Sequence, residues 1–203
     1  MEGTRGKKIN SLVRLAWLLA STLALSGQAQ AVGQSLRLTG VQNGDLILRR
    51  GKGMMSDIAA SFSISDRRFS HVGIAVMKNR KAYVVHSIQD DNKGYNGVVR
   101  EPLSDFLGDV SDWAVYRLKL DRQQQNKLAR TASRYAHQHI AFDTRFDLDS
   151  SNVMYCTELV WRASAEVSQP NLIQPTAQKS GGRFITIEDT YRHNNAVLIE
   201  SMH

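Results

Sequence analysis

The middle of the sequence predicts a β-hairpin, which commits the chain to an antiparallel sheet. Two short runs rich in β-favouring residues, 72–77 and 82–88, flank the polar stretch 78–81. An asparagine in a short polar turn between such runs is typical of a hairpin. If the turn centres on Asn79 and Arg80, Ile74 opposes Val85, and the register of every other residue in the hairpin follows.

This register places two histidines, His71 and His86, on one face of the hairpin as diagonal neighbours. Diagonal partners lie roughly 7–8 Å apart at the backbone, within reach of long side chains. A shift of one residue would put them on opposite faces. The same face carries the small residues Gly73, Ala75 and Ala82, so another element can approach it closely. We expect that element to be a helix beginning near Cys156.

The remaining patterns predict an α+β fold with a mainly antiparallel sheet, because strands and helices do not alternate strictly. A turn at Asn43 and Gly44 precedes a short apolar strand. The expected strands cover residues 45–48 and 113–118, the expected helices cover 54–62, 121–139 and 155–167, a polar loop covers 89–97, and short closing elements cover 185–189 and 197–200. Within the 203 residues we find no internal repeat and no linker that would divide the fold.

The first 31 residues have the pattern of a cleaved secretory signal. A basic segment precedes an apolar run, 15–25, that is too short to span a bilayer comfortably. Ala29-Gln30-Ala31 then gives the small-x-small pattern of a cleavage site. Gln28 stands where a lipoprotein signal would carry its lipidated cysteine. We therefore expect residues 32–203 to form one domain that is periplasmic or secreted and has no lipid anchor.

Cys156 is the single cysteine of the chain, which excludes an internal disulfide and a paired-cysteine metal or redox site. It begins an apolar stripe with Leu159, Val160, Ala163 and Val167, the spacing of one buried helix face. A cysteine in the first helical turn meets unpaired N–H groups that favour the thiolate and can bind an oxyanion. The alternative is a small buried core residue, as most free cysteines are.

Other chemistries find little support in the sequence. The formal net charge is +7, but the basic residues outside the signal are spread out and lack the interleaved aromatics of a nucleic-acid surface. We expect instead a mildly basic surface facing an anionic cell envelope. His137 and His139 are two residues apart, which does not place them on one helical face, so we predict no metal there. No cofactor is predicted.

Three segments, taken in order, resemble one family of enzymes. They are Asn-Gly-Asp-Leu-Ile at 43–47, Ser-His-Val-Gly-Ile at 70–74 and Tyr-Cys-Thr-Glu-Leu-Val at 155–160. Together they resemble the circularly permuted NlpC/P60 group of papain-like cysteine hydrolases, in particular the YiiX/YaeF/YebB-like group. The permutation is visible in the order, because the histidine strand precedes the cysteine helix. The resemblance implies a papain-like α+β core with that helix packed on the sheet.

The resemblance also implies roles for individual residues. Cys156 would be the nucleophile and His71 the general base. The third, polar position falls on His86, where many relatives carry Glu, so His86 would orient the His71 ring without supplying a permanent negative charge. Tyr155 would support the oxyanion, and Asp45 would be a structural residue that satisfies turn or strand-end N–H groups.

We therefore expect an exported thiol hydrolase of the amidase or peptidase type, with acyltransferase activity as a variant. Its substrate would be a cell-wall peptide or a lipid-linked amide or ester. Met54, Met55, Ile58 and Phe62 could line an acyl groove, although we interpret them as core residues. Two other classes stay open. One is a non-catalytic envelope module that binds lipid or peptide in the same cleft, and the other is a metal-binding protein that uses His71, His86 and Cys156.

Overall fold

The computed structural model describes residues 38, 40–150, 152–175, 177–179 and 182–202. The predicted signal segment, 1–31, lies outside the described residues. A six-stranded sheet dominates the fold, with strand order β10-β5-β1-β2-β3-β4 and every neighbouring pair antiparallel. The strands of this sheet are β1 (Leu46–Gly51), β2 (His71–Lys78), β3 (Lys81–Asp90), β4 (Tyr95–Pro102), β5 (Val110–Leu118) and β10 (Ala196–Ser201).

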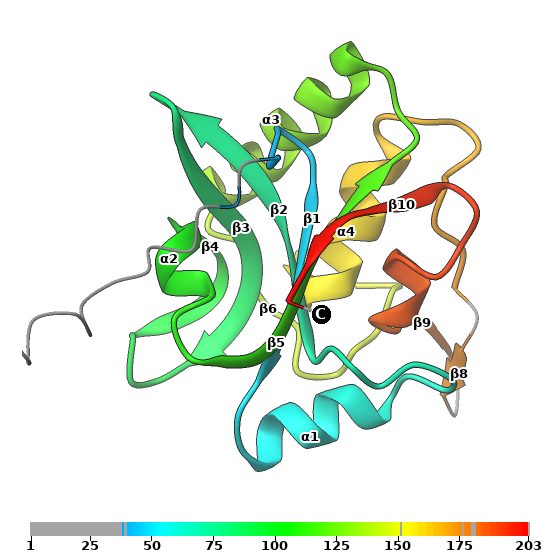
Figure 1. Ribbon diagram of the computed structural model, residues 1–203. Coiled ribbons are helices and arrows are strands. Elements are labelled where there is room, and N and C mark those ends of the chain that lie inside the picture. The colour runs from blue at the N-terminus through cyan, green and yellow to red at the C-terminus, as the bar shows by residue number, and fades with distance from the viewer. Residues whose placement is uncertain (1–37, 39, 151, 176, 180–181, 203) are drawn as a thin grey trace, which may run out of the picture. The chain divides into compact units, whose positions relative to one another are not determined.

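Helices cover both faces of this sheet (Figure 1). They are α1 (Met54–Ser61), α2 (Leu103–Phe106), α3 (Arg122–His137), α4 (Cys156–Ala165) and the 3₁₀ helix η1 (Glu188–Thr190). Two small pairs complete the described elements, a parallel one of β6 (Ala141–Phe142) with β7 (Val153–Met154) and an antiparallel one of β8 (Ala177–Lys179) with β9 (Gly182–Phe184). The α+β prediction is confirmed. None of the helices in the described ranges is long and apolar enough to cross a membrane.

The hairpin register is as predicted. Ile74 pairs with Val85, and the turn residues Asn79 and Arg80 have φ angles of 51° and 61°. Two successive residues with positive φ form the type I′ turn that matches the twist of the flanking strands. The pairing between β2 and β3 ends at Ile74 and Val85, one residue short of His86 and three short of His71.

Alternation along the central strands divides the apolar residues between two faces. Val72 and Ile74 join the larger core, where Leu159 and Val160 of α4 pack. Ala75 joins a smaller core under α2, with Phe106 at its centre. Figure 1 accordingly shows α2 and α4 on opposite sides of the sheet.

The expectation that α4 packs on the face of Gly73 and Ala75 is wrong. That face receives α2, and α4 packs on the face of Val72 and Ile74. The prediction relied on small side chains, which let a helix come close to the sheet. The face of Val72 and Ile74 has larger β-branched side chains and so buries more apolar area against α4, which is the larger effect.

The sequence analysis missed β4, α2 and the short strands β6, β7, β8 and β9. The predicted loop 89–97 is in fact the end of β3, a short turn and the start of β4, and α2 follows directly. Closing residue Glu188 lies in a 3₁₀ helix. The other predicted elements are present with end shifts of a few residues. Asp121 caps α3 as expected, since its side chain accepts from the N–H of Gln124 and the Gln124 side chain accepts in return.

Candidate active site

Cys156 is the first residue of α4, and its sulfur meets the backbone of β2. The N–H groups of Val72, Thr157 and Cys156 itself donate to the sulfur. Val72 immediately follows His71 and lies beyond the end of the pairing between β2 and β3, so its N–H serves the thiol instead of a strand partner. The helix start and the histidine strand are thereby brought together, as the sequence predicted.

A buried carboxylate fixes the start of α4. Glu158 accepts a hydrogen bond from the N–H of Tyr155 at 3.3 Å and pairs with Arg162, one helical turn further on, at 2.6 Å. Burial raises the pKa of Glu158 to about 7, although Arg162 opposes the shift. These contacts hold the backbone on either side of Cys156 in one place.

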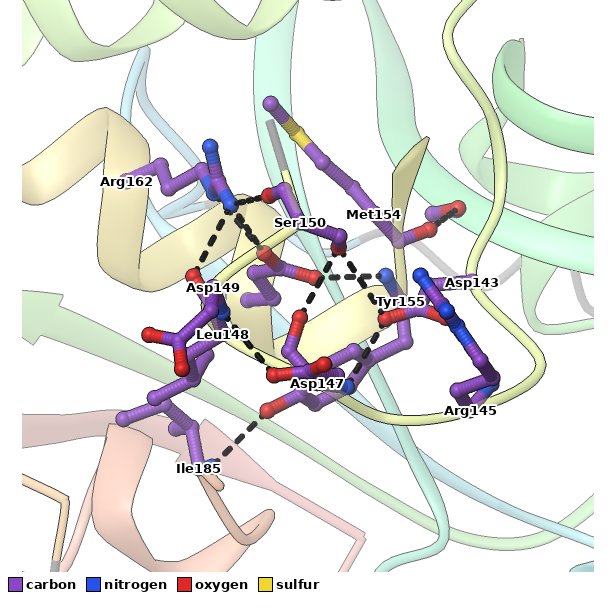
Figure 2. Close-up of polar contacts among 12 residues, drawn as sticks. Asp143, Arg145, Asp147, Leu148, Asp149, Ser150, Met154, Tyr155, Arg162 and Ile185 are labelled. Atoms are coloured by element: carbon purple, nitrogen blue, oxygen red, sulfur yellow. Dashed lines mark hydrogen bonds and ion pairs between the residues drawn. The ribbon is translucent and has the colours of Figure 1, made fainter. Parts of the chain in front are cut away.

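A polar loop, residues 143–150, supports the same region (Figure 2). Asp143 accepts hydrogen bonds from the N–H groups of Arg145 and Asp147, both at 2.8 Å, and Arg162 donates to the carbonyl of Ser150. The hydroxyl of Tyr155 accepts from the N–H of Ile185 at 2.9 Å. Tyr155 is thus a buried residue that ties the loop, α4 and the segment after β9 together. Its role at an oxyanion stays a prediction.

An apolar cavity of about 180 Å³ opens on Cys156. No charged side chain lines it. Its lining comes from α1, from the loop before β7 and from the segment after β9, and it includes Met55, Ile58, Ala59, Phe62, Ser70, Phe146, Tyr155, Cys156, Thr157, Phe184, Ile185, Thr186 and Ile187.

The interpretation of the α1 side chains as core residues is wrong. Met54 and Met55 are 74% and 73% exposed, and Ile58 and Phe62 are 44% and 40% exposed. Met55, Ile58 and Phe62 line the cavity instead. Helical spacing placed them on one stripe correctly, but periodicity does not say whether a stripe faces the core or a cavity.

The two histidines are in direct contact. His71 Nε2 and His86 Nδ1 are 2.8 Å apart, and the rings are nearly perpendicular. Both rings also pack against Phe106 of α2. The predicted diagonal placement on one face is therefore confirmed by the geometry, while the catalytic roles of the two residues stay predictions.

The sequence analysis missed a carboxylate behind His86. Glu101 on β4 places Oε1 3.1 Å from His86 Nε2, and its other oxygen lies 3.0 Å from Nζ of Lys93. His86 is fully buried and Glu101 is 3% exposed. The negative charge that seemed to be absent from the third position is supplied one strand further away. The only signal was an acidic residue in a β-favouring stretch after the polar loop.

Burial favours the neutral forms of both His71 and Cys156. It lowers the pKa of His71 well below its usual value, and the nearby positive charge of Arg49 adds to the effect. Burial likewise raises the pKa of Cys156 to about 11, although hydrogen bonds from the three N–H groups and the charge of Arg49 act the other way. The expectation that the helix N-terminus would lower the thiol pKa is wrong, because desolvation of the thiolate is the larger effect.

Arg49 on β1 is the cation that influences both groups. It lies opposite His71 in the sheet, donates to the carbonyl of Phe106 at 2.7 Å and stacks over the Phe106 ring. A guanidinium remains charged in such a position. It disfavours protonation of His71 and favours a negative charge on sulfur.

Asp45 makes contacts of the kind that its predicted structural role requires, and the role itself stays a prediction. It is fully buried, accepts from the N–H of Gln42 at 2.7 Å and forms an ion pair with Arg117 at 2.7 Å. His137 and His139 lie at the end of α3, away from these contacts. In the part of the chain that the structure describes, no group of three or more His, Cys, Asp or Glu side chains is arranged to hold a metal ion.

Comparison with known proteins agrees with this arrangement. A model of the permuted papain-like amidases of the YaeF/YiiX, C92 family matches residues 40–197. The chain therefore belongs to this family, which makes it a papain-like thiol hydrolase in kind.

Two relatives illustrate the similarity. The uncharacterized protein YiiX of Escherichia coli K12 is 30% identical over 77% of this chain and 81% of its own length. A crystal structure described as the metalloprotein yiiX of Escherichia coli O157:H7 superposes with a TM-score of 0.64 and 21% identity. That match covers 78% of this chain and 96% of the other. At this identity the second match shows the fold alone.

Proposed function

We propose that this protein is an exported thiol hydrolase that cleaves the amide or ester bond of a substrate carrying an acyl chain. Cys156 is the nucleophile, and the acyl chain lies in the adjoining cavity. The observation that carries the proposal is the apolar cavity on Cys156, which has no charged residue in its lining.

The reaction begins from a neutral thiol and a neutral imidazole. As the sulfur attacks the carbonyl carbon, the thiol proton passes to His71, and the carbonyl oxygen takes the negative charge. The backbone N–H of Cys156 at the start of α4 donates to this oxygen, and one such donor is typically worth about 3–4 kcal/mol. His71 then protonates the leaving amine or alcohol. Water, deprotonated by His71, cleaves the thioester and releases the free acid.

The lining of the cavity favours an acyl substrate over a cell-wall peptide. Peptide substrates of the cell wall carry carboxylates and amines, which cost free energy to bury where no charged partner exists. A hydrocarbon chain gains about 0.8 kcal/mol for each CH₂ that leaves water. The exposed methionines on α1 extend the apolar surface beyond the cavity mouth.

Export is part of the proposal and rests on the pattern of residues 1–31. An enzyme acting on acylated envelope components must reach the envelope, and a mildly basic surface would be attracted to its anionic lipids. The acyl acceptor is water in this proposal, and an acyltransferase would replace it with another nucleophile.

Chain-length dependence tests the proposal. With fluorogenic esters from acetyl to dodecanoyl, we expect kcat/KM to rise roughly three- to fourfold per added CH₂ until the cavity is full. Ile58→Ser should weaken this dependence. The matched control Leu198→Ser, an equally exposed residue on β10 outside the cavity, should leave it unchanged.

Other outcomes would overturn parts of the proposal. Cleavage of cell-wall peptides with no chain-length dependence would identify the peptidase alternative. Tight binding of acyl chains without turnover, unchanged in Cys156→Ala, would identify the non-catalytic binding module.

A further inference from the structure

The polar groups behind His71 form a continuous line across three strands. His71 on β2 meets His86 on β3 at 2.8 Å, His86 meets Glu101 on β4 at 3.1 Å, and Glu101 meets Lys93 at 3.0 Å. Lys93 belongs to the turn between β3 and β4 and is exposed, His86 and Glu101 are buried, and His71 at the other end is partly buried. The line therefore runs from His71 through the protein to the surface.

We propose that Glu101 is the positioning residue of this line and that it sets the proton arrangement and basicity of the His71–His86 pair. The proposal rests on the proposed function for what the pair does, but not for how it is arranged. In this proposal the carboxylate of Glu101 supplies the permanent negative charge that His86 cannot provide.

The tautomers follow from the acceptors. A carboxylate accepts only, so His86 must carry its proton on Nε2, facing Glu101. Its Nδ1 then has a lone pair and accepts from Nε2–H of His71. The remaining ring nitrogen of His71, Nδ1, is left unprotonated and is the one that takes the thiol proton. In this step the S–H bond breaks and an N–H bond forms at Nδ1 while sulfur bonds to the carbonyl carbon and the carbonyl oxygen takes the electron pair of the C=O bond; the same proton later leaves with the leaving group.

The contact between His86 and Glu101 is short but not fully directed. Both atoms are buried, and neither forms another hydrogen bond among the described residues. The two atoms are at hydrogen-bond distance, but their orientation is not that of a full hydrogen bond. A buried donor and a buried acceptor that stay unpaired each cost free energy. A positive charge on the histidine pair strengthens this contact, which is the situation that arises during attack.

Two groups keep Glu101 ionised. Burial alone would raise the pKa of its carboxyl, but contacts with His86 and Lys93 outweigh burial and lower the pKa to about 2. The charged groups that act on the histidine pair are thus Glu101 from β4, Lys93 from the adjoining turn and Arg49 from β1. Glu101 is the only anion among these three at neutral pH.

Opposite charge changes give opposite, measurable shifts. In Glu101→Gln the histidine pair loses its anion and becomes harder to protonate. We expect the plateau of kcat/KM to fall roughly 10- to 100-fold, the range seen when carboxylates that orient metal-bound histidines are removed. The acid limb should move to lower pH while KM changes little. Lys93→Met removes the positive charge that counteracts Glu101, so the histidine pair becomes easier to protonate and the acid limb should move to higher pH. Glu101→Asp should restore part of the plateau.

A matched control separates this effect from a general loss of structure. Glu166→Gln removes another carboxylate that is paired with a cation, Arg134, at the C-terminal end of α4. It should shift neither the plateau nor the acid limb. Equal shifts in Glu101→Gln and Glu166→Gln, or a lowered plateau with an unmoved limb in both Glu101→Gln and Lys93→Met, would overturn the proposal.

A second readout does not depend on activity. Nitrogen-15 spectra of the histidine rings should show His86 protonated at Nε2 and His71 at Nε2 in the resting protein. The titration of the pair should move to lower pH in Glu101→Gln. A pair that keeps its tautomers and titration in that variant would refute the assignment. If the predicted tautomers and titration are found but the protein hydrolyses no substrate, the proposed function is refuted and the role of Glu101 in arranging the histidine pair is not.

Discussion

At the scale of single residues, the site depends on a competition between burial and hydrogen bonding at Cys156. The helix start offers N–H groups to the sulfur, as the sequence indicated, but the same packing removes water from the thiolate. The resting thiol is therefore neutral, and in the proposed reaction its proton moves only when the substrate is attacked. Protection from oxidation follows, because the thiolate is the form that oxidants attack.

Alkylation of Cys156 tests this state. Because its pKa is raised to about 11, the labelling rate with iodoacetamide should still be rising above pH 9, where a free thiol near 8.5 has levelled off. At pH 8 labelling should be about 100-fold slower than that of a free cysteine. A curve with its midpoint below 8.5 would show instead that the resting pair is a thiolate and an imidazolium.

At the scale of elements, β2 and β3 approach each other closely where their pairing ends, next to the histidine pair. Gly73 lies at this point, and a Cβ there would come within 2.4 Å of Val84 Cγ1 and 2.9 Å of the Val85 carbonyl oxygen. The close approach of the two strands, and with it the contact of His71 with His86, requires the absence of a side chain at position 73.

Gly73→Ala should therefore damage stability and site together. Forcing a methyl group into this contact should cost about 1–3 kcal/mol of unfolding free energy, measured by urea denaturation. It should also reduce kcat/KM, because the histidine pair is displaced. Gly40→Ala is the control, since its new Cβ would meet only Ile199 at 3.4 Å. Equal stability of the two variants would contradict the close approach.

At the scale of the whole molecule, the two faces of the sheet pack against different elements. The larger core holds α3 and α4 and so positions Cys156, while the smaller core under α2 packs against the rings of the histidine pair. The candidate site lies at the end of the β2–β3 ladder. The apolar cavity is formed by α1 and by segments far apart in the sequence.

Export is a prediction about the whole chain. Because Ala29-Gln30-Ala31 gives the pattern of a cleavage site, protein recovered from the envelope fraction should begin at Val32. Intact-mass measurement decides the matter. A full-length mass that retains Met1 would show that the segment is not removed.

Local signals in the sequence were sufficient for the hairpin, the helix of Cys156, the cap of α3 and the shared face of His71 and His86. Each depends on residues close in the chain, where turn chemistry and side-chain periodicity act directly. The same signals could not reveal Glu101. Glu101 lies on β4, and it contacts His86 only because β4 pairs with β3 in the sheet.

The sequence by itself thus determined the α+β class, the order of the main elements and which side chains could carry the chemistry. The tertiary structure alone decided which face α4 covers, that the α1 side chains line a cavity and that Cys156 is neutral at rest. The physical reason is common to all three. Burial is a property of the assembled molecule, since it depends on how much water the other elements exclude, and no spacing along the chain records it.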